Sequence, residues 1–183
     1  MLISQRMRKV HALQEGQKLY KEGKYEKAVE AYTKAIELDS SYVDAYRERA
    51  KAYLSTLEPN KAVSDLNKVI EAEPGKAENY YLRGFTYKII GDATKGLIDF
   101  NKAIELDPND FKSYHSRGLI HFNQGNTGKA IVDFDSAIEL NPELDGAYYN
   151  RAKAYALLRD YQRAIQDYDR AAKQDPAFAR TFF

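Results

Sequence analysis

The sequence contains no cysteine, which excludes disulfides and thiol chemistry and leaves the redox compartment open. Its net charge is close to zero, because 28 Lys and Arg residues nearly balance 27 Asp and Glu residues, which gives +1 at pH 7. That balance argues against binding to nucleic acid or a membrane surface through bulk charge. No apolar run approaches the ~20 residues of a membrane span, and the start MLISQRMRKV is not a secretory signal. We expect a cytoplasmic protein without membrane insertion or nucleic-acid binding.

What the sequence does contain is a repeated unit of 34 residues, clearest over residues 77–110. Small and apolar residues follow a helical period on both sides of Gly91-Asp92, so the unit predicts two amphipathic helices and a tight turn. Pro108 follows the second helix, which it cannot extend. Five copies follow one another without an insertion: residues 9–42, 43–76, 77–110, 111–144 and 145–178.

Equivalent positions of the copies hold similar side chains. In the first helix, a small slot holds Gly16, Ala50, Gly84, Gly118 and Ala152. Three residues later comes a mostly aromatic slot, with Leu19, Tyr53, Tyr87, His121 and Tyr155. In the second helix, the ladders are Ala28, Ala62, Gly96, Ala130, Ala164 and Tyr32, Leu66, Phe100, Phe134, Tyr168. The closing slot holds Ser40, Pro74, Pro108, Pro142 and Pro176. We expect the small residues, such as Gly84 and Gly96, to let the two helices of a copy approach closely.

This pattern resembles the tetratricopeptide repeat, whose period and small/large/Pro signature it matches over nearly the whole chain. The resemblance implies an all-α fold, in which helix hairpins stack into a right-handed superhelical solenoid spanning residues 1–183 as a single array. Residues 179–183 then correspond to the start of a truncated sixth first helix, with Phe182 in phase with Tyr148. We expect Phe182 to pack on the last hairpin or to enter a neighbouring molecule.

Two local features of this pattern predict backbone geometry. Ser4 is suited to cap the first helix. Leu57 and Arg159 occupy the turn position at which the other copies have Gly23, Gly91 and Gly125. If that position needs a positive φ, both residues are mildly strained there.

Two charged ladders are present in the last four copies and absent from the first. They consist of Arg49, Arg83, Arg117, Arg151 and of Asp65, Asp99, Asp133, Asp167. Because the ladders are present and absent together, we interpret them as internal ion pairs between helices. The alternative is a row of arginines that binds anions.

The sequence offers little for catalysis. His121 takes a slot filled by tyrosine in three copies, so we expect a core residue, and His115 lies six residues from it, on another side of the helix. No nucleophile–base pair, phosphate loop or metal-ligand spacing is present in the sequence. We therefore expect no enzymatic activity, no metal and no cofactor.

The resemblance implies that one face of the first helices lines a concave groove. In copies three to five this face is rich in aromatic and apolar residues with scattered cations: Tyr81, Phe85, Lys88, His115, Leu119, Phe122, Tyr149 and Lys153. It predicts a non-catalytic scaffold that binds a peptide or partner segment there. Alternatively, these side chains pack against the next repeat. Rival functions are a homo-oligomeric module that stacks through its C-terminal end, or the targeting domain of a larger enzyme.

Some tetratricopeptide arrays bind the acidic C-terminus of heat-shock chaperones through a clamp of Lys, Asn and Arg. The first three copies place Leu13, Gln17, Glu48, Glu78 and Leu82 at the clamp positions. The last three place Tyr81, Phe85, Ser116, Gly146 and Asn150 there. Neither set has the clamp chemistry, which argues against an acidic chaperone C-terminus as the partner.

Overall fold

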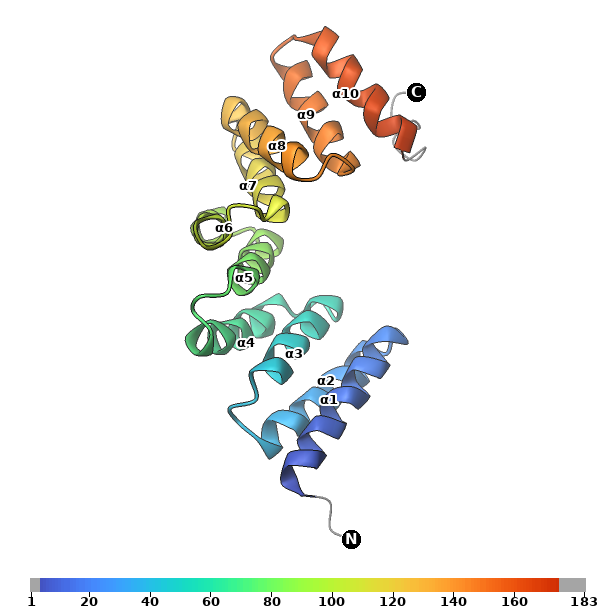
Figure 1. Cartoon of the computed structure of the whole chain (residues 1–183), viewed down its shortest axis with the longest axis vertical. Coiled ribbons are helices and arrows are strands. Elements are labelled where there is room, and N and C mark those ends of the chain that lie inside the picture. The colour runs from blue at the N-terminus through green and yellow to red at the C-terminus, as the bar shows by residue number, and fades with distance from the viewer. Residues whose placement is uncertain (1–3, 175–183) are drawn as a thin grey trace. The chain divides into compact units, whose positions relative to one another are not determined.

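The computed structural model describes residues 4–174, and every regular element within that range is an α-helix (Figure 1). The elements are α1 Gln5–Lys21, α2 Tyr25–Leu38, α3 Val43–Ser55, α4 Pro59–Ala72, α5 Ala77–Ile90, α6 Ala93–Leu106, α7 Phe111–Asn123, α8 Thr127–Leu140, α9 Asp145–Leu157 and α10 Tyr161–Gln174. The all-α prediction is therefore confirmed. None of these described helices combines the length and apolarity that crossing a membrane requires.

The helices form two compact units. The first extends from Met1 to Asp92 and includes α1–α5, and the second extends from Ala93 to Phe183 and includes α6–α10. Within each unit every helix packs against the next one along the chain. α1 also contacts α3, and α7 contacts α9, so the first helices of successive copies are neighbours. Each unit is thus built from tandem helix hairpins.

The second helices are amphipathic in the same way. Their buried positions are Ala28, Ala31, Tyr32, Ala35 in α2, Ala62, Asp65, Leu66, Val69 in α4, Gly96, Asp99, Phe100, Ala103 in α6 and Ala130, Asp133, Phe134, Ala137 in α8. This spacing of i, i+3, i+4 and i+7 is the buried stripe of a helix that packs on one side. The rings of Tyr32, Phe100 and Phe134 are completely buried.

The small slot of the first helix lies against an aromatic ring. A Cβ atom added to Gly16 would lie 2.5 Å from the Tyr32 ring, and one added to Gly118 would lie 2.8 Å from the Phe134 ring. The sequence suggests contact between two small slots, as for Gly84 and Gly96. In the first and fourth copies, however, the close neighbour is the ring of the second helix. A side chain at either glycine would displace that ring.

The turn inside each copy is a Schellman motif, in which a residue with positive φ lets the chain leave the first helix. In the first copy, the N–H groups of Lys24 and Gly23 donate to the carbonyl groups of Leu19 and Tyr20. Leu57 and Arg159 adopt φ values of 60° and 61°, which confirms the expectation that they occupy glycine-type positions.

At the N-terminus, the Ser4 hydroxyl accepts a hydrogen bond from the backbone N–H of Met7, so the predicted N-cap is confirmed. The prediction for Phe182, the closing Pro176 and the truncated sixth helix all fall in residues 175–183, outside the described range.

Candidate functional site

The eight residues that the sequence assigns to the groove are all half-buried. They lie on three first helices. Tyr81, Phe85 and Lys88 are on α5 of the first unit, His115, Leu119 and Phe122 are on α7, and Tyr149 and Lys153 are on α9 of the second unit. A half-buried aromatic residue is held in place by its neighbours and still presents part of its ring to a ligand.

On α5 the three residues form a small cluster. The rings of Tyr81 and Phe85 lie one helical turn apart, with centroids separated by 6.2 Å. The Lys88 ammonium lies 4.8 Å from the centre of the Phe85 ring, which is the geometry of a cation–π interaction. Burial of this ammonium lowers the pKa of Lys88 from its ordinary value. The cation is therefore poorly hydrated, and among residues 4–174 it contacts a ring face in place of a carboxylate.

A second cluster lies on α9 and its neighbours. The Lys153 ammonium is 5.4 Å from the Phe122 ring and 5.7 Å from the Tyr149 ring, so one cation joins α7 and α9 through two aromatic faces. Tyr149 in turn packs edge-to-face on Tyr168 of α10, with centroids 5.7 Å apart. We call Phe122, Tyr149, Lys153 and Tyr168 the α9 cluster.

The sequence places Tyr168 in the second-helix core ladder, and so misses its place in this cluster. The equivalent Tyr32 and Phe134 are completely buried, whereas Tyr168 is half-buried. Burial and the neighbouring Tyr149 raise the pKa of its phenol. The repeat pattern alone does not distinguish Tyr168 from its buried equivalents.

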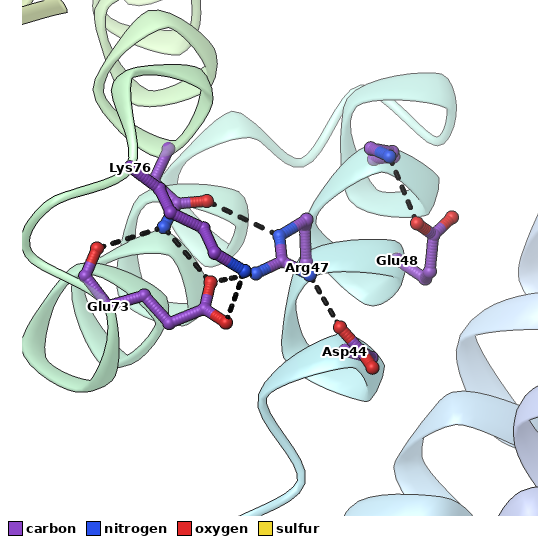
Figure 2. Close-up of polar contacts among 7 residues, drawn as sticks. Asp44, Arg47, Glu48, Glu73 and Lys76 are labelled. Carbon is purple, nitrogen blue, oxygen red and sulfur yellow. Dashed lines mark hydrogen bonds and ion pairs between the residues drawn. The ribbon is translucent and has the colours of Figure 1, made fainter. Parts of the chain in front are cut away.

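The equivalent cations of the second copy are engaged in ion pairs. Arg47 Nη1 lies 2.6 Å from Asp44 Oδ1, and its Nη2 pairs with Glu73, which also lies 2.8 Å from the Lys76 ammonium (Figure 2). Lys51 pairs with Glu48 at 2.9 Å. Lys88 and Lys153, by contrast, form no ion pair among residues 4–174. Among the groove-face cations of residues 4–174, those on α3 are therefore ion-paired, whereas Lys88 and Lys153 are not.

His115 has a structural contact that the sequence does not reveal. Its Nε2 lies 3.1 Å from the side-chain amide nitrogen of Asn150, and its ring centre is 5.8 Å from that of Phe134. The Asn150 amide also donates to the carbonyl group of Gly146 at 2.7 Å. The imidazole therefore helps to connect α7 with α9. Leu119 is half-buried on the same helix.

The Arg and Asp ladders form ion pairs within both units. Arg49 donates through two nitrogens to Asp65, both at 2.8 Å, and Arg117 and Arg151 bind Asp133 and Asp167 in the same bidentate way. The three carboxylates are 4%, 3% and 7% exposed, so each guanidinium neutralises a buried charge. Hydrogen bonds to the buried Asp167 and to a second carboxylate, Asp135, raise the pKa of Arg151 above its ordinary value, so its guanidinium stays charged.

The ladder residues of the third copy, Arg83 and Asp99, belong to different units. In the first unit, Arg83 Nη1 donates to Asn67 Oδ1 at 2.8 Å, and in the second unit Asp99 is buried. The equivalent contacts elsewhere are Arg117 with Asn101 and Arg151 with Asp135, at 2.7 and 2.6 Å. Each of these arginines thus also contacts the second helix of the preceding copy. The ladder side chains connect adjacent copies as well as the two helices of one copy.

Family models described as TPR repeat, for residues 16–56, and as tetratricopeptide repeat, for residues 77–110 and 115–177, match the chain. A search of curated proteins finds no significant match. Among solved structures, MamA has a TM-score of 0.80 at 23% identity, with 96% of each chain covered.

Two further structures have the same architecture. YrrB, described as a TPR protein with an unusual peptide-binding site, has a TM-score of 0.71 at 25% identity, covering 90% of this chain and 85% of YrrB. PilF of Pseudomonas aeruginosa has a TM-score of 0.83 at 21% identity, covering 93% and 78%. With three matching family models and tandem helix hairpins, the chain belongs to the tetratricopeptide repeat family.

Proposed function

We propose that this chain is a non-catalytic interaction scaffold that binds a peptide segment of a partner protein on the first-helix face of copies three to five. The observation that carries the proposal is Lys153, a cation held between the rings of Phe122 and Tyr149 with no ion pair among the described residues. Rigid aromatic side chains lose little entropy on binding and often dominate the affinity of an interface.

The side chains of this first-helix face indicate what kind of peptide segment would fit it. Half-buried rings favour apolar or aromatic anchors, and a lysine without a carboxylate partner favours an acidic group beside them. Lys88 on α5 repeats this combination next to Phe85. The ligand we propose is therefore an extended or helical segment with apolar side chains and at least one Asp or Glu. The description of YrrB as a peptide-binding TPR protein supports this class of ligand.

The experiment is a selection of binding peptides from a random library, followed by affinity measurement on two matched variants. Lys153→Gln removes the cation of the α9 cluster, and Lys51→Gln removes the equivalent lysine, which is already paired with Glu48. We expect Lys153→Gln to weaken selected acidic peptides at least ~5-fold, in line with the ~1 kcal/mol of a partly desolvated charge contact. Lys51→Gln should leave the affinity unchanged.

Two outcomes would reject the proposal. Equal losses in the two variants would mean that binding follows the net charge of the chain rather than the α9 cluster. Failure to select any peptide, together with a particle mass that rises with concentration in light scattering, would favour the self-assembly module instead.

A further inference from the structure

The fourth copy contains a pocket beside His121, at the position where three other copies have tyrosine. It lies between α7 and α8, has a volume of about 300 Å³ and is lined by Arg117, His121, Gly128, Lys129, Val132 and Asp133. A volume of this size is at the lower end of what small-molecule sites offer. A second pocket, of about 400 Å³, occupies the equivalent place in the first copy, beside Leu19 and Lys27. In the mostly aromatic slot these two copies have Leu19 and His121, where the other three have tyrosine.

In the second and fifth copies the tyrosine fills this place between two cations. The Tyr53 ring lies 5.6 Å from the Arg49 guanidinium and 5.4 Å from the Lys61 ammonium. The Tyr155 ring lies 5.9 Å from the guanidinium of Arg151 and 4.4 Å from that of Arg163. The space between the two cations is therefore suited to an aromatic ring.

The fourth copy keeps both cations and lacks the phenol. Arg117 and Lys129 are the equivalents of the cations above, and both line the pocket. The residue between them is His121, whose imidazole is shorter than a phenol. Its Nε2 lies 4.0 Å from Asp133 Oδ2, and its Nδ1 is buried without a hydrogen-bond partner among the described residues. Gly128 opens the rim further, since a Cβ there would have no neighbour within 4 Å.

Lys129 also lacks the carboxylate partner that the equivalent cations have. The equivalent Lys61 pairs with Glu58, and Arg163 Nε donates to Asp160 Oδ2 at 2.6 Å, in each case a carboxylate three residues earlier. The residue three before Lys129 is Asn126, which is neutral. Within residues 4–174 Lys129 forms no ion pair, whereas Arg117 is bound by Asp133. The pocket therefore carries one uncompensated positive charge at its edge.

The pocket of the first copy differs in charge. Glu15 and Glu30 line it together with Lys27 and Lys34, so positive and negative groups balance. In the fourth copy, by contrast, the one carboxylate that lines the pocket is Asp133, which Arg117 already binds, so Lys129 has no lining carboxylate left to balance it.

We propose that the pocket of the fourth copy binds a small aromatic carboxylate, whose ring takes the place of the missing tyrosine while its carboxylate pairs with Lys129. The guanidinium of Arg117 and the ammonium of Lys129 would contact the faces of the ring, as the equivalent cations do in the copies with tyrosine. This site is separate from the proposed peptide face, because at 100° per residue Leu119 lies about 160° around α7 from Arg117 and His121, and Phe122 lies about 100–140° from them.

The probe is 4-hydroxyphenylacetate, titrated into the ¹⁵N-labelled full chain while the backbone amide shifts of Lys129 and Val132 are followed. 4-Methylphenol supplies the ring without the charge. Two variants restore what the tyrosine-containing copies have: His121→Tyr fills the ring position, and Asn126→Asp returns a carboxylate to Lys129. We expect a saturable shift with a Kd of about 1 mM in the wild type, as fits a ligand of this size. Each variant should weaken binding at least ~5-fold, and 4-methylphenol should bind at least ~5-fold more weakly than the acid.

Melting curves show that each variant is folded before its titration is interpreted. The proposal is overturned if the wild type gives no saturable shift at these amides, or if His121→Tyr binds the acid as tightly as the wild type. Equal binding in Asn126→Asp, or equal binding of 4-methylphenol, overturns the assignment of the carboxylate to Lys129.

Discussion

The environment of a lysine on the first helices depends on the residue one turn before it. Glu48 precedes Lys51 by three residues and pairs with it, which leaves little charge for a ligand. The same position before Lys153 holds Asn150, and before Lys88 it holds Phe85. Both of these lysines lie against rings instead. This difference could be read from the sequence, because the i, i+3 spacing is fixed by the helix.

The buried ion pairs allow a test of the ladder interpretation. In Arg117→Met, the Asp133 carboxylate keeps its charge at 3% exposure and loses both hydrogen bonds from the guanidinium. We expect this variant to lose about 2 kcal/mol of unfolding free energy, because a stranded buried charge is costly. The double variant Arg117→Met/Asp133→Asn should lose less. Urea denaturation of both measures the difference, and a double variant no more stable than Arg117→Met would contradict the pairing.

His121 should make stability depend on pH. Burial is the main cause that lowers the pKa of this imidazole, with the positive charges of Arg117 and Lys129 acting the same way and Asp133 opposing them. The unfolded chain, with a histidine pKa of about 6.5, therefore binds the proton more tightly than the folded chain. Stability should fall as the pH falls through about 6.5 toward the lower folded-state pKa.

The measurement is the urea midpoint of wild type and His121→Gln between pH 8 and pH 5. His11 and His115 are present in both proteins, so their contribution cancels in the difference. The wild type should lose stability relative to the variant on acidification. A difference that stays constant over this range would show that the imidazole is not held neutral by the fold.

At the scale of the hairpin, one backbone geometry serves all five turns although the residue at its key position varies. Gly23, Gly91 and Gly125 have φ values of 74°, 89° and 76°, and Leu57 and Arg159 adopt the same region at a cost. The repeat phase alone was sufficient to predict this. The neighbour of the small slot was harder to predict, because Gly118 faces the ring of Phe134, and a ring's direction depends on its rotamer rather than on its position in the sequence.

The turn in the second copy offers a stabilising substitution. Leu57 is 86% exposed at a φ of 60°, so its side chain contributes little packing while its backbone is strained. We expect Leu57→Gly to raise the unfolding free energy by about 0.5–1 kcal/mol, since glycine adopts this region without a Cβ penalty. The reverse change, Gly125→Leu, should lower it by a similar amount. Thermal melting of both variants measures these changes in stability. A destabilised Leu57→Gly protein would show that Leu57 is not strained at this position.

At the scale of the whole chain, the fold was more predictable than the site. The 34-residue period specifies the helices and turns of every copy, because each hairpin repeats the same local contacts. The site depends on side-chain contacts between copies, such as Lys153 of α9 on Phe122 of α7, and on local exceptions such as His121 and Asn126. The repeat is defined by the residues that the copies share, so a residue that differs in a single copy is not predicted by it.

Phe85 and Phe122 are the two phenylalanines of the proposed peptide face. Phe85 belongs to the α5 cluster of the first unit, and Phe122 belongs to the α9 cluster of the second. A peptide that contacts both rings should lose affinity in Phe85→Ala and in Phe122→Ala, and the double variant should lose roughly 2 kcal/mol or more. Both rings are half-buried on first helices, so the fold should survive. Peptide affinity and a melting curve are measured on the same preparations. A peptide that binds one unit alone would respond to only one of the two variants. If the affinity persists while the melting temperature drops sharply, the rings support the core, because their loss then acts on folding rather than on recognition.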